Sequence, residues 1–287
     1  MPAPLDGPGK NLNTPQNSRI ASAAYLAFDA LVSLAGFQEG PHILVACMPK
    51  SGSTLLTNAI GKYDGFRRAR LVPTTGSREP ELCSIKLSRY NHNRYVAQQH
   101  VRNSEWTQHL IAKYKLTPIV LVRDLFDAAI SFRDHIRNES RIWPTAYFTP
   151  RHQEMGDAEL EEAVVRLAIP WYMNFYAGWR ADPNALFVSY EDLVRAPEET
   201  VTAVLKHSGI SPAPEKVKQA IERGQGVDNR KNVGVTGRGK SLTPRAAEEL
   251  QKLIDLYPEF EEDEYFKRMR AGRQTADSGS YKVQASS

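Results

Sequence analysis

The chain has 287 residues, of which 41% are hydrophobic and 24% are charged, and its formal net charge at pH 7 is +4. These proportions are ordinary for a globular protein and exclude wholesale disorder and a long coiled coil. The small basic excess lacks the clustered arginine and lysine of a nucleic-acid-binding surface, so we expect no nucleic-acid partner. The two cysteines, Cys47 and Cys83, show no pairing pattern, which argues against a disulfide framework or a zinc site and favours a reducing, cytoplasmic setting.

A chain of this length can form one large α/β domain or two smaller ones, and we favour one. We predict a flexible arm over residues 1–19, a folded domain over residues 20–269 and a disordered polar tail over residues 270–287. The apolar stretch 20–37 is too short and too interrupted for a membrane span, and we interpret it as an amphipathic helix. No membrane association is expected.

Short β-branched runs alternate with helical periods along the chain, which is typical of a parallel sheet flanked by helices. The fold class that we predict is therefore α/β. In chain order we expect a strand at residues 42–47, a helix at 54–62, strands at 94–98 and 118–122, a helix at 126–135, a long helix at 157–179 broken or kinked at Pro170, a strand at 185–189 followed by a helix from about residue 190, a helix at 214–223, and a helix at 246–257 with Thr243 as its N-cap.

The turn after the first strand has the composition of an anion-binding loop: Met48-Pro49-Lys50-Ser51-Gly52-Ser53-Thr54-Leu55-Leu56. Backbone N–H groups at a helix start lack partners and carry the positive end of the helix dipole, so they attract anions. Gly52 allows close approach, Lys50 adds a full charge, and three hydroxyl groups add donors. In the phosphate loop of nucleoside triphosphatases the lysine follows the last glycine, whereas here Lys50 precedes Gly52.

This inverted order resembles the 5′-phosphosulfate loop of the sulfotransferase family, whose members typically read Pro-Lys-Ser-Gly-Ser/Thr-Thr at this point. The resemblance implies a single domain with a fold like that of P-loop proteins. It also implies sulfuryl transfer from 3′-phosphoadenosine 5′-phosphosulfate (PAPS), with adenosine 3′,5′-bisphosphate (PAP) as product and no metal. The residues implied to hold the 5′ end of the donor are Lys50, Ser51, Gly52, Ser53, Thr54 and Leu55. An ordinary capped helix start is the alternative interpretation.

A second match lies at Val120-Leu121-Val122-Arg123-Asp124 and continues to Ser131. In the family, an arginine at this strand end and a serine eight residues later bind the 3′-phosphate of the donor, and Arg123 and Ser131 have that spacing. An arginine fork matches a phosphate with two parallel hydrogen bonds. The alternative is a structural ion pair between Arg123 and Asp124 or Asp127.

Two later segments resemble further parts of the family's donor site. The glycine-rich basic run 232–240 is similar to the loop that closes over the 3′-phosphate, and it implies roles for Arg238 and Gly239. Many members read Arg-Lys-Gly there, which this chain does not, and a solvated surface loop is the alternative. The run 190–193 resembles the segment that brings a tyrosine near the adenine, so Tyr190 is a candidate for that contact or for a core position.

Sulfuryl transfer requires the acceptor oxygen or nitrogen to lose a proton, for which a neutral histidine is a natural general base. His100 follows the predicted strand at 94–98 and therefore lies at the carboxyl edge of the sheet, where doubly wound sheets bind ligands. Its order and separation from Arg123 resemble those of the family's catalytic histidine, so we choose it over His92 and His109. A surface position is the alternative for a lone histidine in a polar stretch.

The chain departs from the family pattern two residues before this histidine, where many members have a lysine and this chain has Gln98. Charge stabilisation then falls mainly to Lys50 and the amides of the helix start, while Ser53 or Thr54 helps to orient the leaving phosphate. The implied mechanism is an in-line displacement that depends on positioning and electrostatics.

Two other functions remain open from the residues alone. A P-loop kinase needs a lysine after the glycine and an acidic residue for magnesium; Asp124 could supply the second, and nothing supplies the first. A non-catalytic nucleotide-binding protein is the other. We expect a small-molecule or glycan acceptor and interpret residues 137–155 as a lid or substrate loop, because the segment mixes polar and aromatic residues, among them Arg141, Trp143, Tyr147, Phe148, Arg151 and His152.

Overall fold

A computed structural model describes residue 27 and residues 40–71, 81–140, 142–143, 145–225 and 235–271. Apart from residue 27, these residues belong to one compact unit. The predicted arm, nearly all of the predicted helix at 20–37 and the tail beyond residue 271 lie outside the described residues. Residues 264–271 are helical, so this last helix continues two residues past the predicted domain limit at 269.

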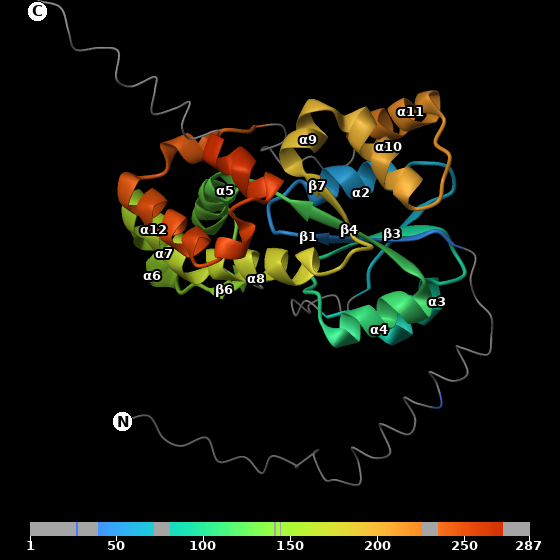
Figure 1. Ribbon diagram of the computed structural model, residues 1–287, viewed down its shortest axis with the longest axis horizontal. Helices are drawn as coiled ribbons and strands as arrows, with labels where there is room; N and C mark the ends of the chain where they lie inside the picture. Colours follow the sequence, from blue (N-terminus) through green and yellow to red (C-terminus); the bar gives the residue numbers. More distant parts are fainter. Residues whose placement is uncertain are drawn as a thin grey trace, which may run out of the picture. The chain divides into compact units, whose positions relative to one another are not determined.

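Five parallel strands form the central sheet, in the order β2-β3-β1-β4-β7 (Figure 1). They are β1 (His42–Cys47), β2 (Arg67–Ala69), β3 (Tyr95–Gln99), β4 (Leu116–Val122) and β7 (Leu186–Ser189). β1 is buried at every position and β4 at nearly every one, as expected for continuous apolar runs covered on both faces. The prediction of a single α/β domain with a parallel sheet is confirmed.

Helices cover both faces of this sheet (Figure 1). One face carries α2 (Ser53–Gly61), α10 (Pro197–His207) and α11 (Pro214–Gln225), and the other carries α3 (Ser84–Tyr90) and α4 (Glu105–Tyr114). Leu56 and Ile60 of α2 and Val204 of α10 pack on Val45 of β1 and Leu121 of β4 in one continuous core. This packing fixes the start of α2 against the end of β1, which is where the anion-binding loop lies.

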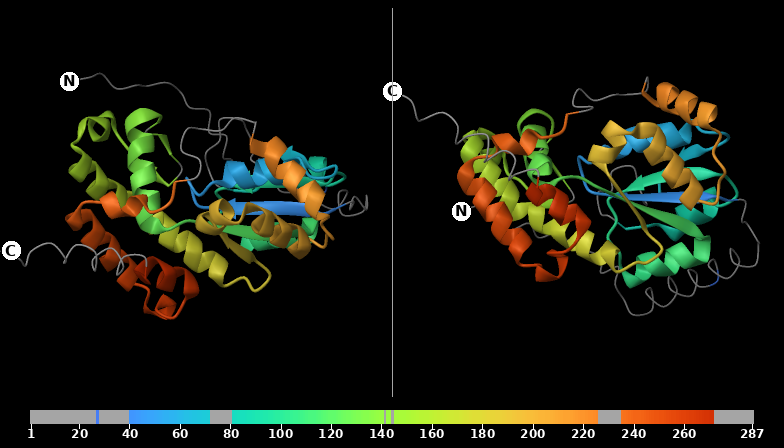
Figure 2. Two further views of the ribbon diagram at one scale, coloured as in Figure 1. Left: turned by 90° about the horizontal axis from the view of Figure 1, so that it is seen from above. Right: turned by 45° about the horizontal axis from the view of Figure 1, so that its top comes forward.

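A second group of helices lies beyond the carboxyl ends of the strands (Figure 2). Its members are α5 (Leu125–Asn138), α6 (Pro150–Glu154), α7 (Asp157–Leu167), α8 (Ile169–Arg180) and α12 (Pro244–Asp255). The predicted break at Pro170 is confirmed, because α7 ends before this proline and α8 begins with it in its first turn.

The buried carboxylate of Glu161 on α7 holds this helical group together. One oxygen pairs with Arg133 of α5 at 2.5 Å, and the other accepts the backbone N–H of Thr243 at 2.8 Å. Thr243 is the N-cap of α12 as predicted, but its side chain makes no capping bond. None of the described helices has the length and apolarity required to cross a lipid bilayer.

Candidate active site

Three neighbouring strands bring the predicted catalytic and donor-binding residues to one edge of the sheet. Lys50 follows β1, His100 follows β3 and Arg123 follows β4. Nδ1 of His100 lies 2.9 Å from the carbonyl oxygen of Cys47, the last residue of β1. Nη1 of Arg123 donates to the carbonyl oxygen of Lys50 at 2.7 Å. The side chains that follow β3 and β4 are therefore both hydrogen-bonded to the backbone at the end of β1.

The loop between β1 and α2 has the backbone shape of an anion cradle. Lys50 and Gly52 both have positive φ, 62° and 76°. The carbonyl of Gly52 accepts from the N–H groups of Leu55 at 2.9 Å and Leu56 at 3.2 Å, which starts the helix. Within the described chain, no residue accepts a hydrogen bond from the backbone N–H of Ser53, the first residue of α2. Such N–H groups at a helix start are suited to bind an anion.

The side chains of this loop differ in exposure. The hydroxyl of Ser51 is buried and donates to the carbonyl oxygen of Met48 at 2.6 Å, so it shapes the turn. The side chain of Ser53 is also buried, whereas Thr54 is exposed and Leu55 is partly buried. Of the three hydroxyl groups predicted to contact the donor, only that of Thr54 is openly accessible in this structure.

The ring of Tyr190, the first residue of α9 (Tyr190–Arg195), lies directly against the loop. A Cβ atom placed on Gly52 would lie 2.6 Å from this ring, and the guanidinium of Arg123 lies 4.3 Å from its centroid. The ring is almost fully buried. Tyr190 therefore occupies a core position and also contacts two of the predicted donor-binding residues.

The hydrogen bond of His100 determines which ring nitrogen can accept a proton. The carbonyl oxygen of Cys47 can only accept, so Nδ1 carries the hydrogen and Nε2 carries the lone pair. Burial lowers the pKa of His100 below its usual 6.5, and the imidazole is therefore neutral at pH 7. Burial also raises the pKa of the neighbouring Cys47 thiol to about 12, which keeps this sulfur protonated. Of these two groups, the imidazole is the one that can accept a proton at pH 7.

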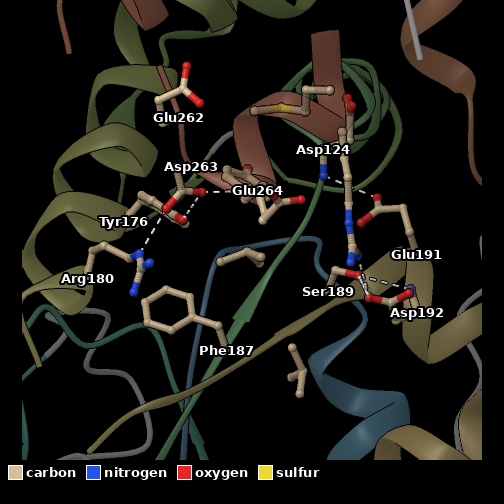
Figure 3. Close-up of a pocket in the computed structure, with 15 residues that line it drawn as sticks. Asp124, Tyr176, Arg180, Phe187, Ser189, Glu191, Asp192, Glu262, Asp263 and Glu264 are labelled. Carbon is tan, nitrogen blue, oxygen red and sulfur yellow. Dashed lines mark hydrogen bonds and ion pairs between the residues drawn. The ribbon is translucent and has the colours of Figure 1, made fainter. Parts of the chain in front are cut away.

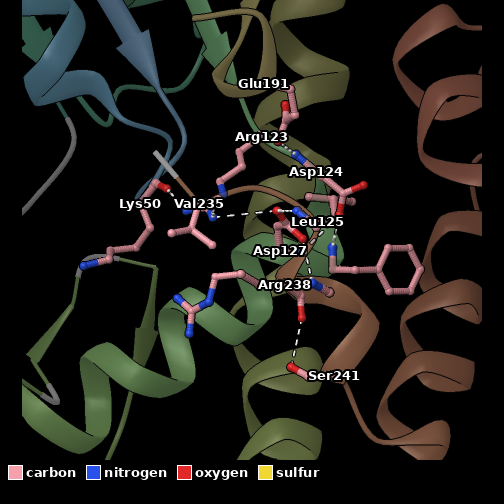
Figure 4. A network of polar contacts seen from close by, with 12 residues as sticks. Lys50, Arg123, Asp124, Leu125, Asp127, Glu191, Val235, Arg238 and Ser241 are labelled. Carbon is pink, nitrogen blue, oxygen red and sulfur yellow. Dashed lines mark hydrogen bonds and ion pairs between the residues drawn. The ribbon is translucent and has the colours of Figure 1, made fainter. Parts of the chain in front are cut away.

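Two of the residues predicted for the 3′-phosphate are deeply buried. Arg123 is 4% exposed and Ser131 on α5 is 1% exposed. The guanidinium of Arg123 also donates to the carbonyl oxygen of Val235 at 3.3 Å and lies 3.8 Å from the carboxylate of Asp127 (Figure 4). The ion pair with Asp127 that the sequence left open is present. Asp124 instead caps α5, because its carboxylate accepts from the N–H groups of Phe126 and Asp127.

Of the predicted late loop, residues 232–234 lie outside the described residues; the described part leads into η1 (Arg238–Ser241), which packs on α5. The N–H groups of Gly237 and Gly239 donate to the carboxylate of Asp127 at 2.8 and 2.6 Å, and Arg238 pairs with Asp134. Sequence reasoning missed Asp134, and it assigned Asp127 only to Arg123. The cations and amides predicted for the 3′-phosphate are thus near Ser131, but in this structure they bind carboxylates.

The family model for the sulfotransferase domain matches residues 40–236, which is more than half of the chain. The chain belongs to the sulfotransferase family. Among curated proteins, no sequence matches it.

A solved sulfotransferase structure shows the same fold. A mouse sulfotransferase, SULT7A1, complexed with PAP, has a TM-score of 0.56 and 17% identity, and the match covers 84% of this chain and 90% of the mouse chain. A retinol dehydratase in complex with androsterone and PAP has a TM-score of 0.48 and 15% identity, with 75% and 79% of the two chains covered. At 17% identity the mouse structure supports the fold alone.

Lys50 of this sulfotransferase makes an ion pair that sequence reasoning missed. Its Nζ lies 3.6 Å from Oε1 of Glu139, at the end of α5, and Oε2 of Glu139 lies 2.9 Å from Nδ1 of His135. No local pattern links these residues, because the contact depends on how α5 packs beside the loop.

The sulfotransferase also has an acidic cavity of about 490 Å³ beside the ends of β4 and β7 (Figure 3). Burial raises the pKa of Asp124 to about 6 and that of Glu191 to about 7. Arg180 and Arg268 also line this cavity, so its walls carry groups of both charges. No group of three or more potential metal ligands gathers in the described parts of the chain. The acidic residues that line the cavity are Asp124, Glu191, Asp192, Glu262, Asp263 and Glu264.

The segment predicted as a lid or substrate loop contains a short antiparallel hairpin, β5 (Ile142–Trp143) and β6 (Ala146–Tyr147), followed by α6. Arg137 anchors its base by donating to the carbonyl oxygens of Gln153 at 2.5 Å and Met155 at 2.7 Å. Phe148 is buried against Phe132 of α5, whereas Tyr147 is 83% exposed. The segment thus has an anchored base and an exposed aromatic ring at the end of β6.

Proposed function

We propose that this sulfotransferase moves a sulfuryl group from PAPS to a hydroxyl or amine acceptor, with His100 as the general base. The observation that carries the proposal is the arrangement of three strand ends. It places an anion-binding helix start, the ammonium group of Lys50 and a neutral imidazole at one edge of the sheet. These are the groups that a reaction between a phosphosulfate and a nucleophile requires.

The residues present fit a donor with two anionic ends. Lys50, Gly52 and the N–H groups at the start of α2 suit the 5′ end, with Ser51, Ser53, Thr54 and Leu55 forming the rest of the loop. Arg123, Ser131, Arg238 and Gly239 suit the 3′-phosphate, and Tyr190 suits a place beside the adenine. The complex of the mouse sulfotransferase with PAP supports the same donor here. Because Arg123 is buried under the carbonyl of Val235, donor binding at the 3′ end must open that contact.

The proposed transfer is a single in-line displacement. The proton of the acceptor passes to Nε2 of His100 while the acceptor oxygen or nitrogen forms a bond to sulfur. The bond between sulfur and the bridging oxygen breaks, and the electron pair goes to the phosphate, which leaves as PAP. Lys50 and the amides of the helix start stabilise the charge that develops on this oxygen. Because burial keeps His100 neutral, the base is ready at pH 7.

The acceptor is proposed to be a small molecule or a glycan that binds near the segment 137–155. The anchored base of this segment and the exposed ring of Tyr147 support a role in acceptor contact. An exposed aromatic side chain suits acceptors with an apolar or ring-shaped body.

Binding and kinetics together test the proposal. PAP should stabilise the protein against heat without magnesium, and ATP with magnesium should not. Lys50→Ala and His100→Ala should each lower turnover by at least about a hundredfold. His109→Ala, on the exposed face of α4, is the control that should keep its activity. Arg123→Ala should mainly weaken donor binding; an unchanged donor affinity would show that the 3′-phosphate binds elsewhere.

A further inference from the structure

We propose that Glu139 is an internal counter-ion that competes with the donor for Lys50 and so lowers the affinity for both donor and product. This inference rests on the proposed function, because it takes Lys50 as a ligand of the 5′ end. Glu139 acts through Lys50 and contacts no reacting atom, so it is a positioning residue.

The contact geometry places Glu139 between two basic groups. Oε1 faces the ammonium of Lys50 at 3.6 Å, and Oε2 faces Nδ1 of His135 at 2.9 Å. The side chain of Lys50 is 12% exposed, so its ammonium is partly withdrawn from water, and that of Glu139 is 36% exposed. An ion pair with one partly buried partner is screened less than a pair in open water.

The position of Glu139 on α5 gives this pair a physical reason. Glu139 is the C-cap residue of the helix, and its backbone N–H bonds to the carbonyl of His135. The carboxyl end of a helix carries partial negative charge, so a carboxylate there is unfavourable unless a cation compensates it. Lys50 supplies this compensation. When another anion takes Lys50, the carboxylate, whose side chain is 36% exposed, can turn toward solvent.

A second pair on the same helix follows the same pattern. Asp134 of α5 pairs with Arg238, the cation proposed for the 3′-phosphate. Asp134 is also held by Arg133 at 2.8 Å, so its removal would disturb the core of the helical group. The side chain of Glu139 is 36% exposed, against 24% for that of Asp134, and we therefore choose Glu139 for the test.

The competition has a definite consequence for affinity. The donor binds only the state in which Lys50 has left Glu139. The apparent dissociation constant equals the intrinsic constant divided by the fraction of molecules in this state, so a smaller fraction gives weaker binding. The effect applies to PAP as well as to PAPS, because both carry a 5′-phosphate. Glu139 therefore also favours release of the product.

The test is calorimetric titration of the whole chain with two probes. PAP carries the 5′-phosphate, and adenosine 3′-monophosphate lacks it. Glu139→Gln should bind PAP about three- to tenfold more tightly than the unchanged protein. Its affinity for adenosine 3′-monophosphate should stay the same. Glu248→Gln is the matched control, since it removes a Glu–Lys pair, with Lys252, on the distant helix α12.

A second pair of variants shows whether the effect passes through Lys50. In a Lys50→Ala background, Glu139→Gln should no longer change PAP affinity, because the competed cation is gone. Damage to the fold cannot imitate the expected result, since it would not tighten binding. Equal or weaker PAP binding by Glu139→Gln overturns the inference, as does tighter binding that persists without Lys50. If the unchanged protein binds no PAP, the proposed function itself has failed, and the two failures are thus distinguishable.

Discussion

Gly52→Ala tests whether the loop after β1 is packed as the structure shows, and Gly65→Ala provides its control. Both glycines have positive φ, 76° and 79°. An alanine in this left-handed conformation costs about 1–2 kcal/mol at either site. At Gly65 a Cβ atom meets nothing within 4 Å, so no further cost is expected.

At Gly52 the new Cβ atom would lie 2.6 and 2.8 Å from two ring carbons of Tyr190. The ring cannot withdraw easily, because it is 3% exposed and lies against the guanidinium of Arg123 at 4.3 Å. Overpacking of this kind costs about 1–3 kcal/mol. Gly52→Ala should therefore lose about 2–5 kcal/mol of unfolding free energy, and Gly65→Ala about 1–2 kcal/mol.

Urea denaturation of the two variants and the unchanged protein measures the difference, and PAP titration of the folded variants measures its effect on the loop. PAP affinity should fall in Gly52→Ala and stay unchanged in Gly65→Ala. Equal losses of stability in the two variants would refute the contact between the loop and Tyr190.

Three further predictions follow from groups described above. Because burial lowers the pKa of His100, kcat/KM should rise with pH only below 6.5 and be level from there to pH 8; a midpoint above 7 in initial-rate measurements would exclude this imidazole as the base. Burial raises the pKa of Glu191 from 4.5 to about 7, so the protonated acid stabilises the folded state and this stability is lost as pH rises through 7. Glu191→Gln should therefore raise the unfolding free energy at pH 8 by up to about 3 kcal/mol and show no gain at pH 4. Urea denaturation at both pH values measures the difference. In Gly239→Ala the new Cβ atom would lie 2.5 Å from the Cβ atom of Phe126, so we expect the unfolding free energy to fall by about 2–4 kcal/mol and PAP to bind more weakly. Gly237→Ala is the control, because its Cβ atom meets open space and only the positive φ has a cost. Similar losses in the two variants would contradict the packing.

The central fold was predictable because its strands are continuous apolar runs. β1 has the predicted bounds, and β3, β4 and β7 lie within two residues of theirs. β2 was missed because its three residues include two arginines, and only pairing with β3 makes it a strand. The short helices α3 and α6 were also missed, since neither is long enough to show a helical period.

The candidate site was predictable only in its local parts. The order of Lys50 and Gly52, and the positions of His100 and Arg123 after strands, could be read along the chain. The partners that hold these cations could not, because Glu139 reaches Lys50 through the packing of α5 and not through any periodic pattern. The charges of the donor site are therefore balanced by contacts between segments that are distant in sequence.

The parallel ladder at the centre of the sheet also bears on how this protein could be redesigned. Lys50, His100 and Arg123 follow three neighbouring strands of the sheet. Main-chain hydrogen bonds set the distance between neighbouring strands at about 4.8 Å. The hairpin β5–β6 forms a separate two-stranded sheet and contributes nothing to that spacing. Because residues 137–155 are proposed to contact the acceptor, randomising residues 142–147 should alter which nucleophile is accepted and leave the strand spacing at the proposed donor site unchanged. This hairpin is therefore the place to start a directed-evolution library.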